Sequence, residues 1–143
     1  MMNNIMEVKF SAISENESLA RVIVASFAAK LDPTVDELVD IKTAVSEAVT
    51  NAIIHGYEED SSKFVFLRCE IEGNTIKIIV EDEGYGIENV EKAMEPLYTS
   101  KPELDRSGMG FTVMKSFMDD VEVSSVKDNG TRIEMTKKIN VPK

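Results

Sequence analysis

The sequence is poor in cysteine, in histidine and in positive charge, and each shortage excludes a class of site or partner. Cys69 is the only cysteine, so it cannot form an internal disulfide, and we expect a small strand residue rather than a metal ligand. His55 is the only histidine, which excludes a histidine-rich metal site. The net charge of −10 argues against direct binding to nucleic acid, because phosphate backbones are held by clustered lysine and arginine. It does not exclude a nucleotide ligand, since one pocket can be locally positive or recruit a divalent cation.

Long apolar runs are also missing from the sequence. No segment approaches the roughly 20 apolar residues of a membrane span, and the N-terminal MMNNIMEVKF lacks the basic and apolar regions of a signal peptide. We therefore expect a cytoplasmic protein with no membrane partner. At 143 residues the chain is long enough for one domain with a core and too short for two, so residues 1–143 are expected to form a single domain.

Strand and helix patterns alternate along the chain. Residues 5–12 alternate as a strand does. Ser14–Glu17 and Thr34–Glu37 form capping boxes, and they predict two helices, of which the second is closed by Gly56. The apolar positions expected to face the core follow helical spacing: Leu19, Val22, Ile23, Phe27 and Leu31 in the first helix, and Leu38, Ile41, Val45, Ala48, Val49 and Ala52 in the second.

Two hairpins and a long irregular stretch complete the pattern. The hairpins are predicted over residues 64–84, turning at Gly73-Asn74, and over residues 121–139. Residues 82–111 hold two prolines, four glycines and only a short predicted helix near 89–94, and such a stretch is usually functional or mobile. A last helix is expected to begin near its end. The order predicts an α+β fold, a two-layer sandwich with helices covering one face of a mostly antiparallel sheet.

Three polar side chains line up on the second predicted helix. Glu47, Asn51 and His55 are each four residues apart, so they form one stripe beside the apolar face. Glu47 is either a surface charge or a general base. Asn51 is either a solvated residue or an oxygen ligand for Mg²⁺. His55 fits the end of a helix better than a catalytic role.

Two glycine-rich segments flank the irregular stretch. Ser107–Gly110 comes just before a predicted helix, where free N–H groups and the helix dipole suit a phosphate group. Alone this signal is weak, because most such segments are only turns, and the spacing matches neither a Walker A loop nor a dinucleotide fingerprint. The other segment, Asp82-Glu83-Gly84-Tyr85-Gly86, ends a strand. Asp82 is there either a turn acceptor or an acceptor for the amino group of a base.

Together and in this order, the segments resemble the ATP-binding fold shared by DNA gyrase, Hsp90, sensor histidine kinases and MutL, the Bergerat fold. The matching boxes are Glu47 and Asn51 in SEAVTNAIIHG, Asp82, Gly84 and Gly86 in EDEGYGI, Gly108 and Gly110 in SGMGF, and a late Gly130-Thr131. The match covers about residues 40–135.

A narrower resemblance covers essentially the whole chain. SENESLARVIVASF, SEAVTNAIIHGY and EPLYTSKPELDRSGMGFTVM are similar to the family of anti-sigma F factors of endospore-forming bacteria. Members of that family are sporulation anti-sigma factors and protein serine kinases in one chain. The general-stress anti-sigma B kinases have the same boxes and are the alternative relatives.

The resemblance implies roles for the boxes. Asn51 would coordinate Mg²⁺ that bridges the ATP phosphates, and Glu47 would orient or deprotonate the attacking serine of a protein substrate. Asp82 would accept a hydrogen bond from the adenine amino group, with Thr131 and a water helping. Gly84 and Gly86 would let the backbone pass close to the adenine.

The resemblance also implies an ATP lid over about residues 87–106. The residues implied near the phosphates are Thr99, Ser100, Lys101, Arg106, Ser107, Gly108, Met109 and Gly110. The family pattern has Thr-Thr-Lys where this chain has Thr99-Ser100-Lys101, which puts only the fine packing of the lid in doubt. Arg21 lies on the helix that contacts protein partners in this family.

The implied activity joins regulation and catalysis. As a homodimer, the protein would bind a sigma factor and keep it from RNA polymerase, and it would phosphorylate a serine of an anti-anti-sigma protein. ATP would favour the sigma complex and ADP the complex with the antagonist, because a ligand shifts a switch only by binding its states unequally. An ATP-gated binding module without kinase activity is the alternative from another class. A sensor histidine kinase fragment is disfavoured, because the chain has no dimerisation helix pair with a phosphoacceptor histidine.

Overall fold

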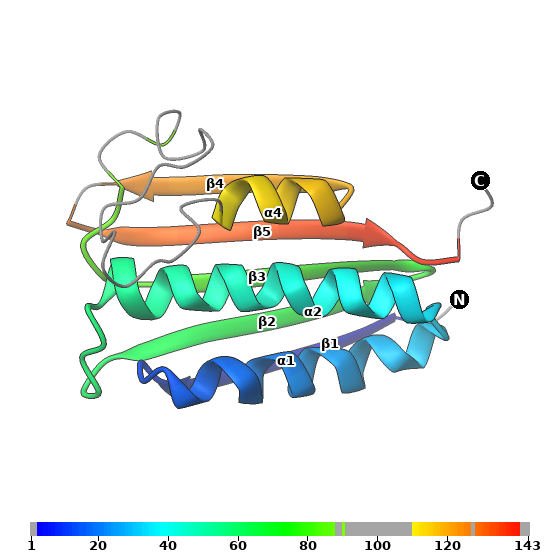
Figure 1. The fold of residues 1–143 in the computed structure, drawn as a ribbon, viewed down its shortest axis with the longest axis horizontal. Helices are drawn as coiled ribbons and strands as arrows, with labels where there is room; N and C mark the ends of the chain where they lie inside the picture. Colours follow the sequence, from blue (N-terminus) through cyan, green and yellow to red (C-terminus); the bar gives the residue numbers. More distant parts are fainter. Residues whose placement is uncertain (1–2, 88–89, 91–109, 127, 141–143) are drawn as a thin grey trace.

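The computed structural model describes residues 3–87, 90, 110–126 and 128–140, which form one sheet layer and one helix layer (Figure 1). The strands are β1 (Asn3–Ser11), β2 (Phe64–Glu72), β3 (Thr75–Asp82), β4 (Asp120–Val126) and β5 (Gly130–Lys138). The helical segments are α1 (Glu15–Ala28), η1 (Ala29–Leu31), α2 (Val35–Thr50), η2 (Asn51–Gly56) and α4 (Gly110–Phe117). The predicted α+β sandwich is confirmed.

The sheet has the strand order β1-β2-β3-β5-β4, and each neighbouring pair is antiparallel. Both predicted hairpins are confirmed, β2 with β3 and β4 with β5. β5 lies between β3 and β4, in a register that pairs Asp82 with Thr131. The end of β3 and the start of β5 are therefore neighbours, although they are distant in the sequence.

One face of the sheet packs against the helices (Figure 1). Alternate side chains of β2 point to this face and are buried, namely Val65, Leu67, Cys69 and Ile71. Cys69 is thus the small strand residue that the sequence predicted. Burial raises the pKa of its thiol to about 12, so the thiol stays protonated at neutral pH and unreactive.

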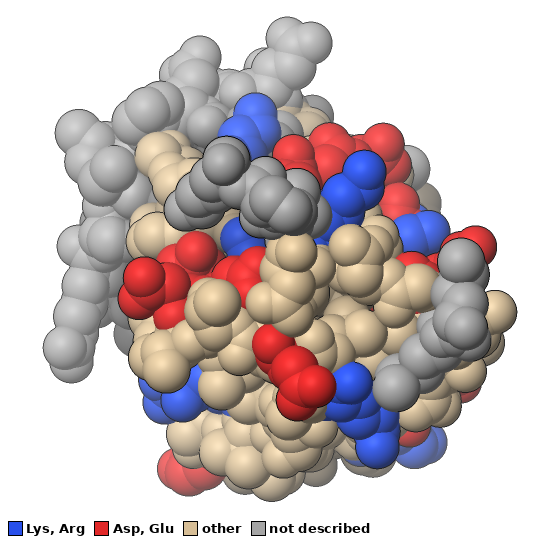
Figure 2. All heavy atoms as spheres, turned by 90° about the vertical axis from the view of Figure 1, so that its right-hand side faces the viewer, with Lys and Arg blue, Asp and Glu red and all other residues tan. Residues whose placement is uncertain are grey.

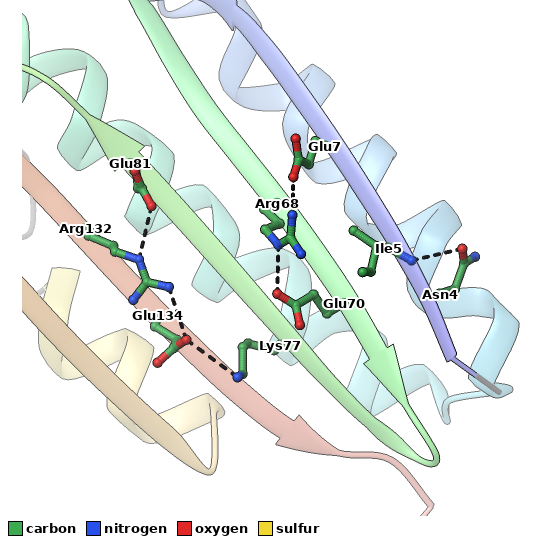
Figure 3. A network of polar contacts seen from close by, with 9 residues as sticks. All are labelled: Asn4, Ile5, Glu7, Arg68, Glu70, Lys77, Glu81, Arg132 and Glu134. Atoms are coloured by element: carbon green, nitrogen blue, oxygen red, sulfur yellow. Dashed lines mark hydrogen bonds and ion pairs between the residues drawn. The ribbon is translucent and has the colours of Figure 1, made fainter. Parts of the chain in front are cut away.

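The opposite face of the sheet has no helix of the described part of the chain on it, and it carries ion pairs (Figure 3). Arg68 pairs with Glu70 at 2.8 Å and with Glu7 of the adjacent strand, and Arg132 pairs with Glu81 at 3.1 Å. Because these side chains are partly exposed, each pair contributes at most about 1 kcal/mol to stability. Exposed apolar side chains lie on the same face: Ile5, Phe64 and Phe66.

The first helix, α1, departs from the prediction at its start and in its buried side. Ser14 has helical backbone angles and makes no capping hydrogen bond, so the predicted Ser14–Glu17 capping box is wrong. The carboxylate of Glu17 instead pairs with Arg21 at 3.2 Å. Leu19 and Val22 were expected in the core but are 47% and 61% exposed. The helix buries mostly smaller side chains: Ala20, Val24, Phe27 and Ala28.

The second helix, α2, begins at its predicted capping box. Thr34 Oγ1 accepts a hydrogen bond from the Glu37 N–H at 3.1 Å, and Glu37 Oε1 accepts one from the Thr34 N–H at 2.9 Å. Its buried stripe agrees with the predicted one except that Ala44 is added and Leu38 is only partly buried. The buried residues are Ile41, Ala44, Val45, Ala48 and Val49.

Beyond Thr50 the helix widens into one π-helical turn, η2, where an ordinary helix was predicted. The N–H of Tyr57 bonds the carbonyl of Ala52, five residues back, at 3.1 Å. Gly56 lies inside this turn and is not among the glycines with positive φ, so its predicted role as a helix terminator is wrong. A side chain at Gly56 would place its Cβ 2.7 Å from the carboxyl group of Asp82. π-turns within helices frequently mark functional sites.

The irregular stretch lies mostly outside the described residues. The helix expected near 89–94 therefore cannot be compared, apart from Val90, which is helical. The last helix, α4, is confirmed but ends at Phe117. Among the helices of the described residues, none combines the length and the apolar character that crossing a membrane requires.

The two ends of the sandwich carry different features: a hollow lined by charged side chains at one end, and the segments singled out in the sequence at the other. At the end shown in Figure 2, acidic side chains lie beside basic ones. A hollow there is lined by Asp36, Glu37, Asp40, Asp119, Asp120, Lys137 and Lys138, among other residues. Lys137 Nζ donates to the carbonyl of Phe117 at 2.8 Å and so ties β5 to α4. The opposite end carries η2, the end of β3 and the start of β5, which are the segments singled out in the sequence (Figure 1).

Candidate functional site

A small pocket, with a cavity volume of about 20 Å³, opens where η2, β3 and β5 meet. Its lining residues come from segments that are far apart in the sequence: Asn51, His55, Gly56, Asp82, Gly86, Ile87, Thr131 and Ile133. Four of the residues predicted to bind ATP, Asn51, Asp82, Gly86 and Thr131, are therefore together in one place. The pocket is apolar at Ile87 and Ile133 and polar at its acidic and amide groups, as small-molecule sites commonly are.

Close backbone contact between η2 and the turn after β3 forms one wall of this pocket. The Tyr85 N–H donates to the Gly56 carbonyl at 3.0 Å. A Cβ on Gly84 would lie 1.9 Å from that same carbonyl oxygen. Gly84 therefore lets η2 and the turn come together, and its role in letting the chain pass the adenine, which the resemblance implied, stays a prediction.

Asp82 is the buried acidic residue of the pocket, with 7% of its surface exposed. Its Oδ1 accepts the Gly84 N–H at 2.9 Å, and the Thr131 backbone N–H also bonds its carboxylate. Burial raises the pKa of Asp82 to about 6, against the opposing effect of these two N–H groups. At neutral pH the side chain is therefore mostly a carboxylate, and a carboxylate only accepts hydrogen bonds. This supports the prediction that it receives an amino group.

The raised pKa of Asp82 predicts a specific pH dependence of stability. The unfolded chain ionises Asp82 near pH 3.8 and the folded chain near pH 6, so the folded state binds the extra proton between these values. The free energy of unfolding should fall as pH rises through this window, by roughly 3 kcal/mol for this one group.

We expect urea unfolding of wild type and Asp82→Asn at pH 4 and pH 7 to reveal this contribution of Asp82 to the free energy of unfolding. Between pH 4 and pH 7, the free energy of unfolding of wild type should fall by roughly 3 kcal/mol relative to that of the variant. Contributions from other carboxylates cancel in the comparison. A wild-type-to-variant difference that is equal at both pH values would contradict the assignment.

The start of β5 reaches the pocket because Gly130 leaves room for it. Gly130 has a φ of 94°, and a Cβ there would lie 2.1 Å from the Asp82 carbonyl oxygen. This close approach puts Thr131 next to Asp82, and Thr131 is itself buried. Thr131 thus lines the pocket, and the predicted part of the Gly130-Thr131 pair in binding the adenine stays a prediction.

Two residues that the sequence did not single out hold the turn after β3. Tyr57 Oη accepts the Glu83 N–H at 2.5 Å, and Ser125 Oγ accepts the Ile87 N–H at 2.6 Å. Burial raises the pKa of Tyr57, so its hydroxyl remains neutral. Their roles depend on contacts across the fold, and no local pattern in the sequence indicated them.

The polar stripe of the second helix divides between two places. Asn51 and His55 line the pocket. Both belong to the π-turn, which begins at Asn51. The Glu47 carboxylate instead lies at the first residue of α4, where a Cβ on Gly110 would be 3.2 Å from Glu47 Oε2. Glu47 and Gly110, far apart in the sequence, are thus neighbours beside the pocket. All three polar side chains of the stripe are partly buried, as expected at the edge of a core-facing surface.

Other predicted site residues cannot be placed or lie elsewhere. Those outside the described residues are Thr99, Ser100, Lys101, Arg106, Ser107, Gly108 and Met109. Arg21 is on α1, partly exposed and paired with Glu17, and does not line the pocket. Its predicted contact with a protein partner stays a prediction.

The residues that line the pocket suit Mg²⁺ only if a single protein oxygen binds the ion and waters and phosphate oxygens complete its coordination. Within residues 3–87, 90, 110–126 and 128–140, no group of three or more His, Cys, Asp or Glu side chains is arranged to hold a metal ion. Mg²⁺ in nucleotide sites keeps several waters and phosphate oxygens, so a single protein oxygen is enough. The amide oxygen of Asn51 on the pocket lining is of the right chemistry.

Comparison with known proteins agrees with this geometry. The family model of the histidine kinase-like ATPase domain matches residues 10–137. The chain is 66% identical to an anti-sigma F factor of Clostridium perfringens, over 97% of this chain and 99% of that protein. It is 58% identical to an anti-sigma F factor of Anoxybacillus flavithermus, over 99% of this chain and 97% of that protein.

Solved structures with low sequence identity share the fold. The RsbU and RsbW domains of a Mycobacterium tuberculosis protein match with a TM-score of 0.70 and 18% identity, over 97% of this chain and 33% of that chain. The catalytic domain of histidine kinase ThkA matches with a TM-score of 0.59 and 15% identity, over 94% and 96% of the two chains. The chain therefore belongs to the histidine kinase-like ATPase family and, within it, to the anti-sigma F factors.

Proposed function

We propose that this protein binds and inhibits a sporulation sigma factor and, as an ATP-dependent serine kinase, phosphorylates and so inactivates the anti-anti-sigma protein. The observation that carries the proposal is the convergence of Asn51, Asp82 and Thr131 on one pocket, in a chain 66% identical to an anti-sigma F factor. Membership of an ATPase family implies that the pocket takes ATP.

Nucleotide binding follows from the chemistry of the pocket wall. The buried carboxylate of Asp82 accepts a hydrogen bond from the amino group of the adenine. Thr131 lies beside Asp82 and contributes to binding the same base. The Asn51 amide oxygen would be a ligand of Mg²⁺, which supplies charge neutralisation at the phosphates. The backbone turns at Gly84 and Gly130 keep this wall rigid, because both are held by direct contact with neighbouring backbone.

Phosphate transfer needs a group that receives the proton of the attacking hydroxyl. Glu47 has its carboxylate at the first residue of α4, next to the segment Ser107–Gly110 that is predicted to hold the phosphates. A general base must come within about 3 Å of the substrate hydroxyl. This position beside Gly110 supports Glu47 as the proposed general base.

The protein partners are proposed to contact α1. Leu19 and Val22 are exposed on the same helix as Arg21, although apolar side chains of this size are usually buried. Arginine is enriched at protein interfaces, and exposed apolar side chains gain most from being covered by a partner. This combination supports the predicted partner role of Arg21, with the sigma factor and the anti-anti-sigma protein as its candidates.

The homodimer is proposed to form through the open face of the sheet. Arginine, lysine and glutamate alternate on that face (Figure 3), so two copies can offer each other opposite charges around Phe66. Phe66→Glu should shift wild-type dimers to monomers in sedimentation experiments, whereas Val35→Glu, which changes an exposed side chain on α2, should not. A monomeric wild type would contradict the proposal.

The kinase proposal is tested by mixing the protein with a sporulation anti-anti-sigma protein and radiolabelled ATP. Label on a serine of that substrate is the expected result, and label on a stress-response homologue alone would favour an anti-sigma B-type kinase. Tight ATP binding and sigma binding without any labelled substrate would favour the ATP-gated binding module instead.

A further inference from the structure

The hydroxyl of Ser125 lies behind the pocket wall and contacts three groups at once. Its Oγ is 2.6 Å from the Ile87 backbone nitrogen, 3.0 Å from the Gly130 carbonyl oxygen and 2.8 Å from Thr131 Oγ1. Ile87 and Thr131 both line the pocket, whereas Ser125 itself does not. Among the residues that hold the turn after β3, Ser125 is thus in contact with two pocket-lining residues.

The chemistry of these groups fixes the direction of each hydrogen bond. A serine hydroxyl has one hydrogen and two lone pairs. The Ile87 N–H can only donate, so one lone pair of Ser125 Oγ accepts it. The Gly130 carbonyl can only accept, so the Ser125 hydroxyl donates its hydrogen there. One lone pair remains, and it accepts the hydroxyl hydrogen of Thr131.

Because the one hydroxyl hydrogen of Thr131 is donated to Ser125, Thr131 Oγ1 can only accept hydrogen bonds from any other partner. Asp82, its neighbour across β3 and β5, is a carboxylate at neutral pH and also only accepts. The wall formed by these two residues then accepts hydrogen bonds and donates none from its side chains. Such a wall favours a ligand amino group and opposes a ligand carbonyl oxygen at the same place.

We propose that Ser125 is a specificity-determining residue that orients the Thr131 hydroxyl, so that the pocket selects 6-aminopurine over 6-oxopurine nucleotides. The inference rests on the proposed binding of ATP and names how the base is chosen. Ser125 acts through Thr131 and touches no ligand, so it is a positioning residue.

The test compares the affinities of ATP and inosine triphosphate, which carry an amino group and an oxo group at the same ring position. In Ser125→Ala, the Thr131 hydroxyl is free to rotate and donate to the oxo group. We expect the ATP preference to fall about fivefold, the worth of one hydrogen bond. A general loosening of the pocket lowers both affinities and cancels in their ratio.

Matched variants separate this role from a structural one. Ser124→Ala changes the adjacent, exposed serine and should keep the wild-type ratio. Ser125→Thr retains the hydroxyl and should also keep it. Thr131→Val removes the hydroxyl that is oriented, so adding Ser125→Ala to it should change the ratio no further.

The possible outcomes are distinct. An unchanged ratio in Ser125→Ala, or an equal loss in Ser124→Ala, would overturn the role of Ser125 while leaving ATP binding intact. A wild type that binds neither nucleotide in calorimetry would overturn the proposed function and this inference with it.

Discussion

Glu47→Gln should lower the rate of phosphate transfer about a hundredfold or more while leaving ATP affinity nearly unchanged. A positioned general base commonly contributes about 10²–10⁴ to a rate, and glutamine keeps the size of the side chain but cannot take a proton. Glu47 is not among the residues that line the pocket with Asp82 and Thr131, so removing its charge leaves the proposed adenine contacts in place.

The measurement for Glu47 is a single-turnover transfer assay combined with ATP titration by calorimetry. Glu59→Gln is the matched control, because it makes the same change at an exposed residue just beyond η2. Transfer at the wild-type rate in Glu47→Gln would remove Glu47 as the base. A large loss of ATP affinity in the same variant would instead assign it to binding.

Gly84→Ala should have the largest effect on the pocket itself. Its Cβ would lie 1.9 Å from the Gly56 carbonyl oxygen, which belongs to rigid backbone and cannot rotate away. The turn after β3 must then separate from η2, and the hydrogen bond from the Tyr85 N–H to that carbonyl is lost. We expect a loss of about 3 kcal/mol or more in the free energy of unfolding, and at least a tenfold loss of ATP affinity.

Gly73→Ala provides the control for this substitution. Gly73 has a φ of 62° in the turn between β2 and β3, so alanine there costs about 1 kcal/mol of stability without a steric contact near the pocket. Urea unfolding and ATP titration of both variants separate a general loss of stability from damage to the site. Wild-type stability and affinity in Gly84→Ala would contradict the close packing of η2 against the turn.

The parts of the fold that could be predicted from the sequence are those determined by local patterns. The strands of the two hairpins follow from alternation and turn residues, and the Thr34–Glu37 capping box fixes the start of α2. The buried side of α1 could not be predicted in the same way. Its sequence carries apolar residues around much of the helix, and the structure buries Ala20 and Ala28 while Leu19 and Val22 stay outside.

The residues of the candidate site also differ in whether a local pattern of the sequence could indicate them. Asn51, Asp82 and Thr131 could be predicted because their motifs are short and their order along the chain is typical of a known fold. Tyr57, Ser125 and the role of Gly56 could not, because each acts through a contact with a segment distant in the sequence. The π-turn at η2 was likewise not predicted, since the sequence pattern indicated an ordinary helix there.

A crystal structure of the protein with Mg²⁺ and a non-hydrolysable ATP analogue tests the central claim most directly. The account predicts the adenine amino group within hydrogen-bond distance of the Asp82 carboxylate, and the metal ion on the Asn51 amide oxygen. A base bound elsewhere, or a metal ion held without Asn51, would contradict it.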